Sequence, residues 1–320
     1  MMTRPADPKP ADSAESELRL ALARDDAAVA GVGPVLRHLL VADEPALFSE
    51  EVVARVRAAL TDLSGQLCHA VTVAHGLDAP LPPEDPAVAR LVRALAEVPG
   101  MLAHVHALAL EAQLAAALQA RIGLDPVLSP LVQALVASDQ QRTAADAMHF
   151  LAAQARLHRQ IGTMHLPLGE LPPELLHGAL EALRETLGGA GGTLHPDFAA
   201  CAEPAAEAIR ARYDERASRA GLAARLVTGL GGGLIAALQL PHAGVALFAS
   251  ALSLACQQDR AGVVLAMQGG QHLRLALMLR AAGLRTAAVN ENLAALDAPP
   301  APDALGRLDA ARAARLLAGA

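Results

Sequence analysis

The chain has 320 residues, 53% of them apolar, which is enough to build the core of two medium domains or of one elongated helical array. A formal charge of −7 and an aromatic content of 2% argue against a nucleic-acid partner, because such a partner needs a basic face and stacking side chains. Lys9 is the only lysine and lies in a polar start, which excludes P-loop, protein-kinase and pyridoxal-phosphate mechanisms that need a structured lysine.

The cysteines Cys68, Cys201 and Cys256 are widely spaced and never form a CxxC pair. Their odd number and spacing predict neither a disulfide framework nor a cysteine-based zinc site, so we expect reduced thiols that are buried as small hydrophobic groups. The N-terminus carries prolines where a secretory peptide needs an apolar run, which favours a cytoplasmic protein. Frequent alanine, with arginine in place of lysine, indicates a GC-rich bacterial genome.

Helix is the predicted local structure after a short tail. Residues 1–16 are rich in Pro, Asp, Ser and Glu without apolar periodicity, so we expect this tail to be disordered. Beyond it, Ala, Leu, Arg, Gln and Glu predominate, and in 50–73 the apolar residues recur at three- and four-residue intervals. Breaks rich in Pro and Gly leave about ten predicted helices and no convincing strand, so the predicted fold class is all-α.

An internal echo divides 17–187, the predicted N-terminal domain, into candidate tandem units of 17–98 and 113–187. The run LPPE at 81–84 recurs at 171–174, and each copy leads into a predicted helix. Duplicated helical units predict an α-solenoid-like array or paired helical bundles. Sequence rich in Ala and Leu also produces such echoes by chance, so a single irregular bundle stays open as the alternative.

Two carboxylate-x-x-His pairs resemble a metal site. Each pair places a carboxylate and an imidazole on one helical face, as in helical bundles that bind two metal ions. The candidate metal ligands are Asp146, His149, Glu174 and His177, with Glu111 as the most suitable further carboxylate. The alternative is a set of solvated polar positions, since the helix dipole already favours an acid such as Glu174 in a first helical turn.

A second set of polar residues predicts a protein-binding surface. Acid and base residues share one face of a helix predicted over 129–160. Another charged helix is predicted over 203–219, where spacings of three and four residues allow the charges to pair with each other on an exposed surface. The candidate protein-binding residues are Asp139, Arg142, Arg212, Arg216 and Arg219.

The second half of the chain is predicted to follow a linker. Small residues fill 188–192 and cannot hold a helix, so a C-terminal helical domain is expected over 193–297. Residues 298–320 are predicted to form a Pro-rich linker and a terminal helix. We expect limited proteolysis near 188–192 to give two stable fragments.

The segment 226–258 contains no charged residue. Because Gly and Pro interrupt it, we expect a buried hairpin of two short helices, with membrane contact as the alternative. Within it, Gly231-x-Gly233-x-x-Ala236 fits a relaxed dinucleotide fingerprint, but no strand precedes it and the chain has no Tyr-x-x-x-Lys. We therefore expect these glycines to let two helices approach closely.

Three segments carry a resemblance to known proteins. The same pattern of Ala and Leu with interspersed Pro and His occurs in Leu128–Leu135, Ala147–Leu157 and Met164–Pro173. This pattern resembles that of uncharacterised alphaproteobacterial Ala/Leu-rich all-helical proteins of unknown function that are described as HEAT-like. The resemblance implies an all-helical fold and a cytoplasmic location, and it carries over no catalytic residue.

These observations favour a non-enzymatic helical interaction or regulatory protein that binds another protein or a second copy of itself and needs no cofactor. The alternative is a helical-bundle metalloprotein or metalloenzyme that uses the carboxylate-x-x-His pairs. A second alternative is a membrane-associated or lipid-binding helical protein that uses 226–258. We expect neither nucleic acid nor a membrane as the partner.

Overall fold

The computed structural model describes residues 10–41, 50–163, 165–188 and 196–318, and every regular element in these ranges is a helix. The all-α prediction is confirmed. The structure has more helices than the ten expected, because several are only one or two turns long. The first helices are α1 (Pro10–Val41), α2 (Glu50–Ala74), α3 (Pro86–Glu97), α4 (Met101–Ile122), α5 (Pro130–Val136), α6 (Gln141–Gly162), α7 (Pro173–Gly188) and α8 (Pro196–Ala199).

The remaining helices complete the chain and include most of the short ones. They are α9 (Ala202–Arg212), α10 (Arg219–Gly229), α11 (Leu234–Ala237), α12 (Leu240–Cys256), α13 (Arg260–Ala266), α14 (His272–Ala281), α15 (Thr286–Ala295), α16 (Asp303–Gly306) and α17 (Ala310–Ala318). Short 3₁₀ helices are η1 (Leu168–Glu170), η2 (Glu215–Ala217) and η3 (Gly231–Gly233).

Local sequence explains where several helices begin and end. α3 and α5 start at Pro86 and Pro130, because a proline in the first turn gives up no intrahelical hydrogen bond. The residues before them, Asp85 and Ser129, accept backbone N–H groups of the first turn through their side chains. α4 ends at Gly123, which adopts the left-handed conformation with a φ of 68°.

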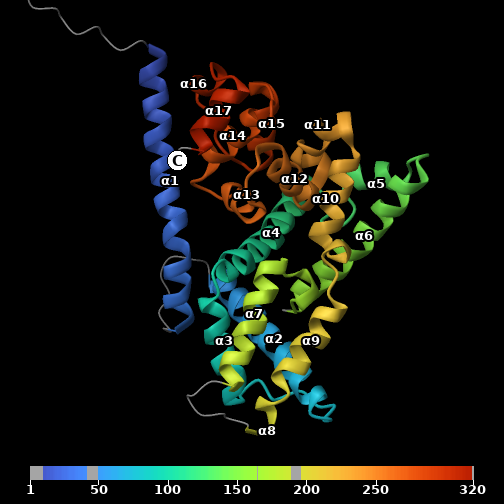
Figure 1. Ribbon diagram of the computed structural model, residues 1–320. Coiled ribbons are helices and arrows are strands. Elements are labelled where there is room, and N and C mark those ends of the chain that lie inside the picture. Colours follow the sequence, from blue (N-terminus) through green and yellow to red (C-terminus); the bar gives the residue numbers. More distant parts are fainter. Residues whose placement is uncertain (1–9, 42–49, 164, 189–195, 319–320) are drawn as a thin grey trace, which may run out of the picture.

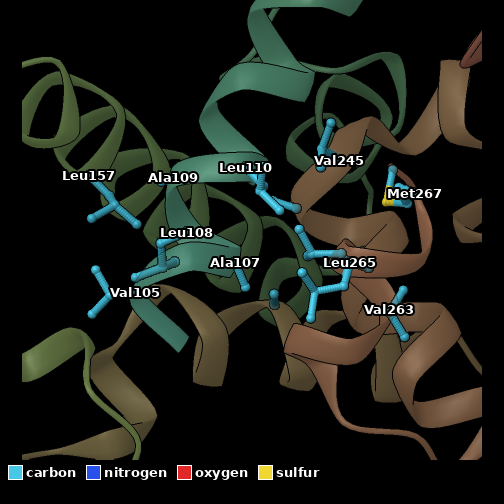
Figure 2. Close-up of a cluster of buried hydrophobic side chains, with 14 of the residues drawn as sticks. Val105, Ala107, Leu108, Ala109, Leu110, Leu157, Val245, Val263, Leu265 and Met267 are labelled. Atoms are coloured by element: carbon cyan, nitrogen blue, oxygen red, sulfur yellow. The ribbon is translucent and has the colours of Figure 1, made fainter. Parts of the chain in front are cut away.

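The helix α4 crosses the middle of the molecule (Figure 1). It packs against α2 and α3 on one side and against α12 and α13 on the other. Figure 2 shows the centre of this core, where Leu108 and Leu110 of α4 lie among Leu157 of α6, Val245 of α12 and Leu265 of α13. The apolar residues of α4 are therefore divided between two groups of helices.

The uncharged segment 226–258 is buried only in part. α12 is buried almost continuously from Ala243 to Leu252, whereas Ile235 in α11 is 65% exposed. By length and composition, α4 could cross a membrane, and the bent pairs formed by α10 with η3–α11 and by α12 with α13 raise the count to as many as three. In the most apolar part of α4, 61% of the residues are buried inside the protein.

The expectation that the glycines at 231–233 bring two helices together is wrong. They form the exposed turn η3, and a Cβ added at Gly231 or Gly232 would meet no atom within 4 Å. Close approach occurs elsewhere: a Cβ at Gly178 would lie 2.6 Å from Val98 Cγ1, so α7 can lie against the end of α3.

The cysteines match their prediction in part. Cys68 is buried, and burial followed by the charge of Asp85 raises the pKa of its thiol to about 12. Cys201 and Cys256 are half-buried, and Cys201 Sγ lies 3.7 Å from His75 Nδ1.

Helices from both sides of 189–195 pack against each other. α9 lies on α2 and α7, α10 lies on α6, and α13 lies on α4. The buried side chains of both parts belong to one cluster. The two candidate tandem units differ in local structure at their prolines, because Pro34 lies inside α1 whereas Pro130 begins α5.

We expect the two parts to stay together when the chain is cut between them. A specific protease site inserted between Gly191 and Gly192 should yield fragments that co-elute in size-exclusion chromatography and separate only in denaturant, because they share one core. Fragments that separate under native conditions and each keep a cooperative thermal transition would contradict this expectation and support two independent domains.

Candidate functional site

Two neighbouring cavities follow the outer side of α2, and we call them together the α2 groove. The first has a volume of about 670 Å³ and lies between α2 and the segment 80–88. The second has a volume of about 440 Å³ and lies between α2, η1 and α9. Gln66 and His69 line both cavities, so the groove continues along the helix.

Small side chains on α2 make room for the first cavity. Ala54, Ala58 and Gly65 recur at helical spacing and line it, while Leu81 and Val88 provide apolar contacts from the opposite wall. A Cβ added at Gly65 would meet no atom within 4 Å. The helix therefore presents an apolar face that no other segment of the described ranges fills.

The second cavity is lined mostly by apolar side chains. Val73, Leu168 and Ile209 line it, and Val73 is 49% exposed. Tyr213 closes one end, where its hydroxyl donates a hydrogen bond to the carbonyl oxygen of Leu171 at 2.8 Å. Burial, followed by the charge of Glu215, raises the pKa of Tyr213 to about 12, so its hydroxyl stays a donor at neutral pH.

Polar groups at the edge of the groove are already paired with each other. Asp62 Oδ1 lies 2.8 Å from His165 Nδ1, and Asp62 Oδ2 accepts the backbone N–H of Leu166 at 2.9 Å. Gln66 donates to the carbonyl oxygen of Leu166 at 2.7 Å and accepts the backbone N–H of Leu168 at 3.2 Å. These bonds hold the segment before α7 against α2.

A buried charged cluster lies in the core beyond η1. Glu111 of α4 accepts hydrogen bonds from Arg219 of α10 and from Arg260 of α13, with the Nη2 atoms 3.1 and 2.9 Å from Glu111 Oε2. The shorter bond joins Arg219 Nη1 to Glu111 Oε1. Arg219 Nη1 also lies 3.4 Å from Gln154 Oε1, and Arg260 Nε donates to Ser250 Oγ at 3.2 Å. One carboxylate therefore connects helices from both halves of the chain.

The two arginines determine the ionisation of Glu111. Burial acts to raise the pKa of this carboxyl group, but the guanidinium groups of Arg219 and Arg260 outweigh burial and lower the pKa to about 2. The side chain of Arg219 is 3% exposed and that of Glu111 is 9% exposed, so water gives this cluster little screening.

The candidate metal ligands do not assemble into one site. Asp146 pairs with Arg225 at 3.0 Å, and exposed His177 lies 3.3 Å from Glu181. His149 and Glu174 are exposed on α6 and α7. Within the described ranges, no group of three or more His, Cys, Asp or Glu side chains could hold a metal ion. Glu111, the further carboxylate, belongs to the charged cluster.

The predicted protein-binding residues lie in different places. Asp139 and Arg142 are exposed around the start of α6, Arg216 is exposed in η2, and Arg212 lines the second cavity of the groove. Arg219 is a correction, because it is 2% exposed and cannot contact a partner at the surface.

The helix predicted over 203–219 is interrupted, which explains the error at Arg219. The Asp214 side chain accepts the backbone N–H of Arg216 at 2.9 Å, and the Ser218 side chain accepts that of Gly221 at 3.0 Å. These caps end one helix and start another, so Arg219 opens α10 and turns inward. Sequence reasoning gave Glu111 the wrong role and missed Arg260, although Glu111 is an isolated charge in an apolar helix.

No family model, no curated protein and no solved structure matches the chain. The resemblance to HEAT-like helical proteins therefore stays a prediction, as do the bacterial origin and the cytoplasmic location. A function can be argued only from the geometry of the α2 groove and of the interior.

We expect Glu111→Gln to lower the free energy of unfolding by about 3–5 kcal/mol, because two buried guanidinium groups lose their shared countercharge. Urea unfolding at pH 7 measures this change. Glu207→Gln on exposed α9 is the matched control and should stay within about 0.5 kcal/mol of the wild type. A loss below about 1 kcal/mol in Glu111→Gln would show that the cluster contributes little to stability.

We expect stability to fall as the pH drops from about 6.5 towards 4.5. Burial, followed by the charges of Arg260 and Arg219, lowers the pKa of His104 to about 4, and burial lowers that of His106 to about 4. An unfolded imidazole titrates near 6.5, so in this window the unfolded chain binds protons that the folded chain does not bind.

Each histidine should contribute a loss of about 3 kcal/mol by pH 4, since one pKa unit corresponds to about 1.4 kcal/mol. Urea unfolding at pH 7.5, 6.5, 5.5 and 4.5 tests this. Replacing His106 with Gln should reduce the slope. A flat profile across the window, or an unchanged slope in His106→Gln, would contradict the assignment.

Proposed function

We propose that the protein binds an apolar segment of another protein in the α2 groove and does not itself catalyse a reaction. The observation that carries this proposal is the continuity of two apolar cavities along one helix, joined at Gln66 and His69. An apolar groove beside a helix commonly binds the apolar face of a partner helix.

The size of the groove favours an elongated occupant. Its two cavities together exceed the range of about 300–1,000 Å³ that is usual for small-molecule pockets. Lining residues run from Ala54 to Ala74, which corresponds to about 30 Å along a helix axis. An amphipathic helix of comparable length, with anchors three and four residues apart, would fit this span.

The walls of the groove support recognition by burial of apolar surface. Val73, which lines the second cavity, is 49% exposed and would be covered by a bound segment. The polar groups of Asp62 and Gln66 are already paired with 165–168, so they stay satisfied when water leaves the groove. Arg212 at the second cavity can meet an acidic residue at one end of the partner.

Fewer observations support the metalloprotein and membrane alternatives. A metalloprotein would need ligands beyond the described residues, since Asp146 and His177 already have protein partners. A membrane role stays a hypothesis that rests on the apolar segment 226–258 and on the length and composition of α4. The α-solenoid-like array and the tandem duplication likewise stay predictions that support the same partner-binding role.

Filling the groove tests the proposal. Gly65→Phe places a ring in the first cavity, where an added Cβ meets no atom, so the fold should stay intact while partner binding falls at least tenfold. Gly229→Phe at the exposed end of α10 is the matched control, because a Cβ there also meets nothing and the position lies outside the groove.

A photo-crosslinking amino acid at Ala58, used in cells, would identify the occupant. The expected result is one recurrent polypeptide, joined through an apolar segment, that disappears in the Gly65→Phe background and persists in Gly229→Phe. Cross-links that resist Gly65→Phe, or co-purification of a small apolar molecule instead of a polypeptide, would overturn the proposal. Cross-links to a second copy of the chain would identify the protein itself as the partner.

A further inference from the structure

A separate cavity of about 210 Å³ lies between α4, η1, α10 and α13, and we call it the inner cavity. Its lining contains groups of both charges, the guanidinium groups of Arg219 and Arg260 and the carboxylates of Glu170, Glu215 and Asp259. The α2 groove described above uses none of these side chains. The inner cavity lies next to the charged cluster, with which it shares Arg219 and Arg260.

The guanidinium groups in the wall of the inner cavity keep unused hydrogen-bond donors. Arg219 and Arg260 both bind the carboxylate of Glu111, which lines a different, smaller cavity. Arg260 uses Nη2 for Glu111 and Nε for Ser250, while its Nη1 makes no hydrogen bond to any residue that the structure describes. Arg219 Nε is buried and also lacks a hydrogen-bond partner in the described ranges. A guanidinium donor is therefore available at this wall.

The anionic wall has unused acceptor capacity. The carboxylate of Glu170 accepts the backbone N–H of Arg219, at 3.1 Å from Oε2 and 3.4 Å from Oε1, and receives no side-chain donor among the described residues. Glu215 lines the same cavity, is exposed, and forms no ion pair within the described part of the chain. A carboxylate can accept up to about four hydrogen bonds, so both acids can receive a ligand cation.

We propose that the inner cavity binds a small zwitterion of the α-amino-acid class, with its carboxylate on Arg260 and its ammonium group on Glu170 and Glu215. A simple anion would be attracted by Arg260 but repelled by Glu170, Glu215 and Asp259, and a simple cation would be attracted by these acids but repelled by the two arginines. A zwitterion satisfies both walls at once, and a guanidinium forms its strongest hydrogen bonds with a carboxylate.

The volume and the apolar lining narrow the ligand further. A cavity of about 150 Å³ can hold a molecule of the size of benzene, so 210 Å³ has room for a small amino acid. Ala107, Leu108, Leu171 and Pro172 supply apolar surface in the same cavity. A short aliphatic side chain such as that of valine fits this lining.

Calorimetry and thermal unfolding with three matched probes test the proposal. Valine should bind and raise the melting temperature, whereas N-acetylvaline, which lacks the ammonium charge, and isobutylamine, which lacks the carboxylate, should bind at least tenfold more weakly. No binding by valine or by any other protein amino acid would overturn the proposal. Equal binding of either analogue would also overturn it, because one wall would then contribute nothing.

A surface variant separates binding from folding. Glu215→Gln removes a negative charge at an exposed position and should weaken valine binding at least fivefold without changing the melting temperature of the unliganded protein. Glu207→Gln on α9 is the matched control and should bind valine like the wild type. Equal valine affinity in Glu215→Gln and in the control would remove Glu215 from the site and overturn the stated binding mode.

Discussion

The carboxylate of Glu111 is the point on which the arrangement of the helices depends. It lies in α4, at the middle of the molecule, and binds the first residues of α10 and α13, which follow it by more than 100 residues. A buried ion pair is costly to desolvate, so such a cluster persists only when its partners are held in place. Apolar packing of α4 against α12 and α13 supplies that constraint, and the cluster in turn holds the first turn of α10 against α4.

The start of α10 determines the position of η1, the three-residue element between the two candidate binding regions. Glu170 in η1 accepts the backbone N–H of Arg219, while Leu168 on its other side lines the α2 groove. Gln66 and Tyr213 hold the same segment from the groove side through backbone hydrogen bonds. Because both regions share this wall, a displacement of η1 would change the groove and the inner cavity together.

Sequence periodicity predicted the helices well where the determining signals are local. The pattern over 50–73 predicts α2 almost to its ends. The helix expected over 129–160 begins at Pro130 but is divided into α5 and α6, because 137–140 are not helical. The prediction of one helix over 203–219 is wrong, because Asp214 and Ser218 cap backbone groups and divide the segment. A side-chain cap changes helix stability by a few tenths to about 2 kcal/mol. Apolar spacing alone therefore does not predict whether a helix ends at a cap or continues.

The candidate site was harder to predict because spacing shows which residues share a helical face but not what that face meets. Asp146 and His149 share a face of α6, yet Asp146 meets Arg225 and His149 meets solvent. A more specific signal is an isolated charge in apolar sequence. Glu111 stands in the apolar helix α4, and Arg260 follows soon after the uncharged segment 226–258. Because a buried charge is costly without a countercharge, opposite charges in such surroundings are expected to meet.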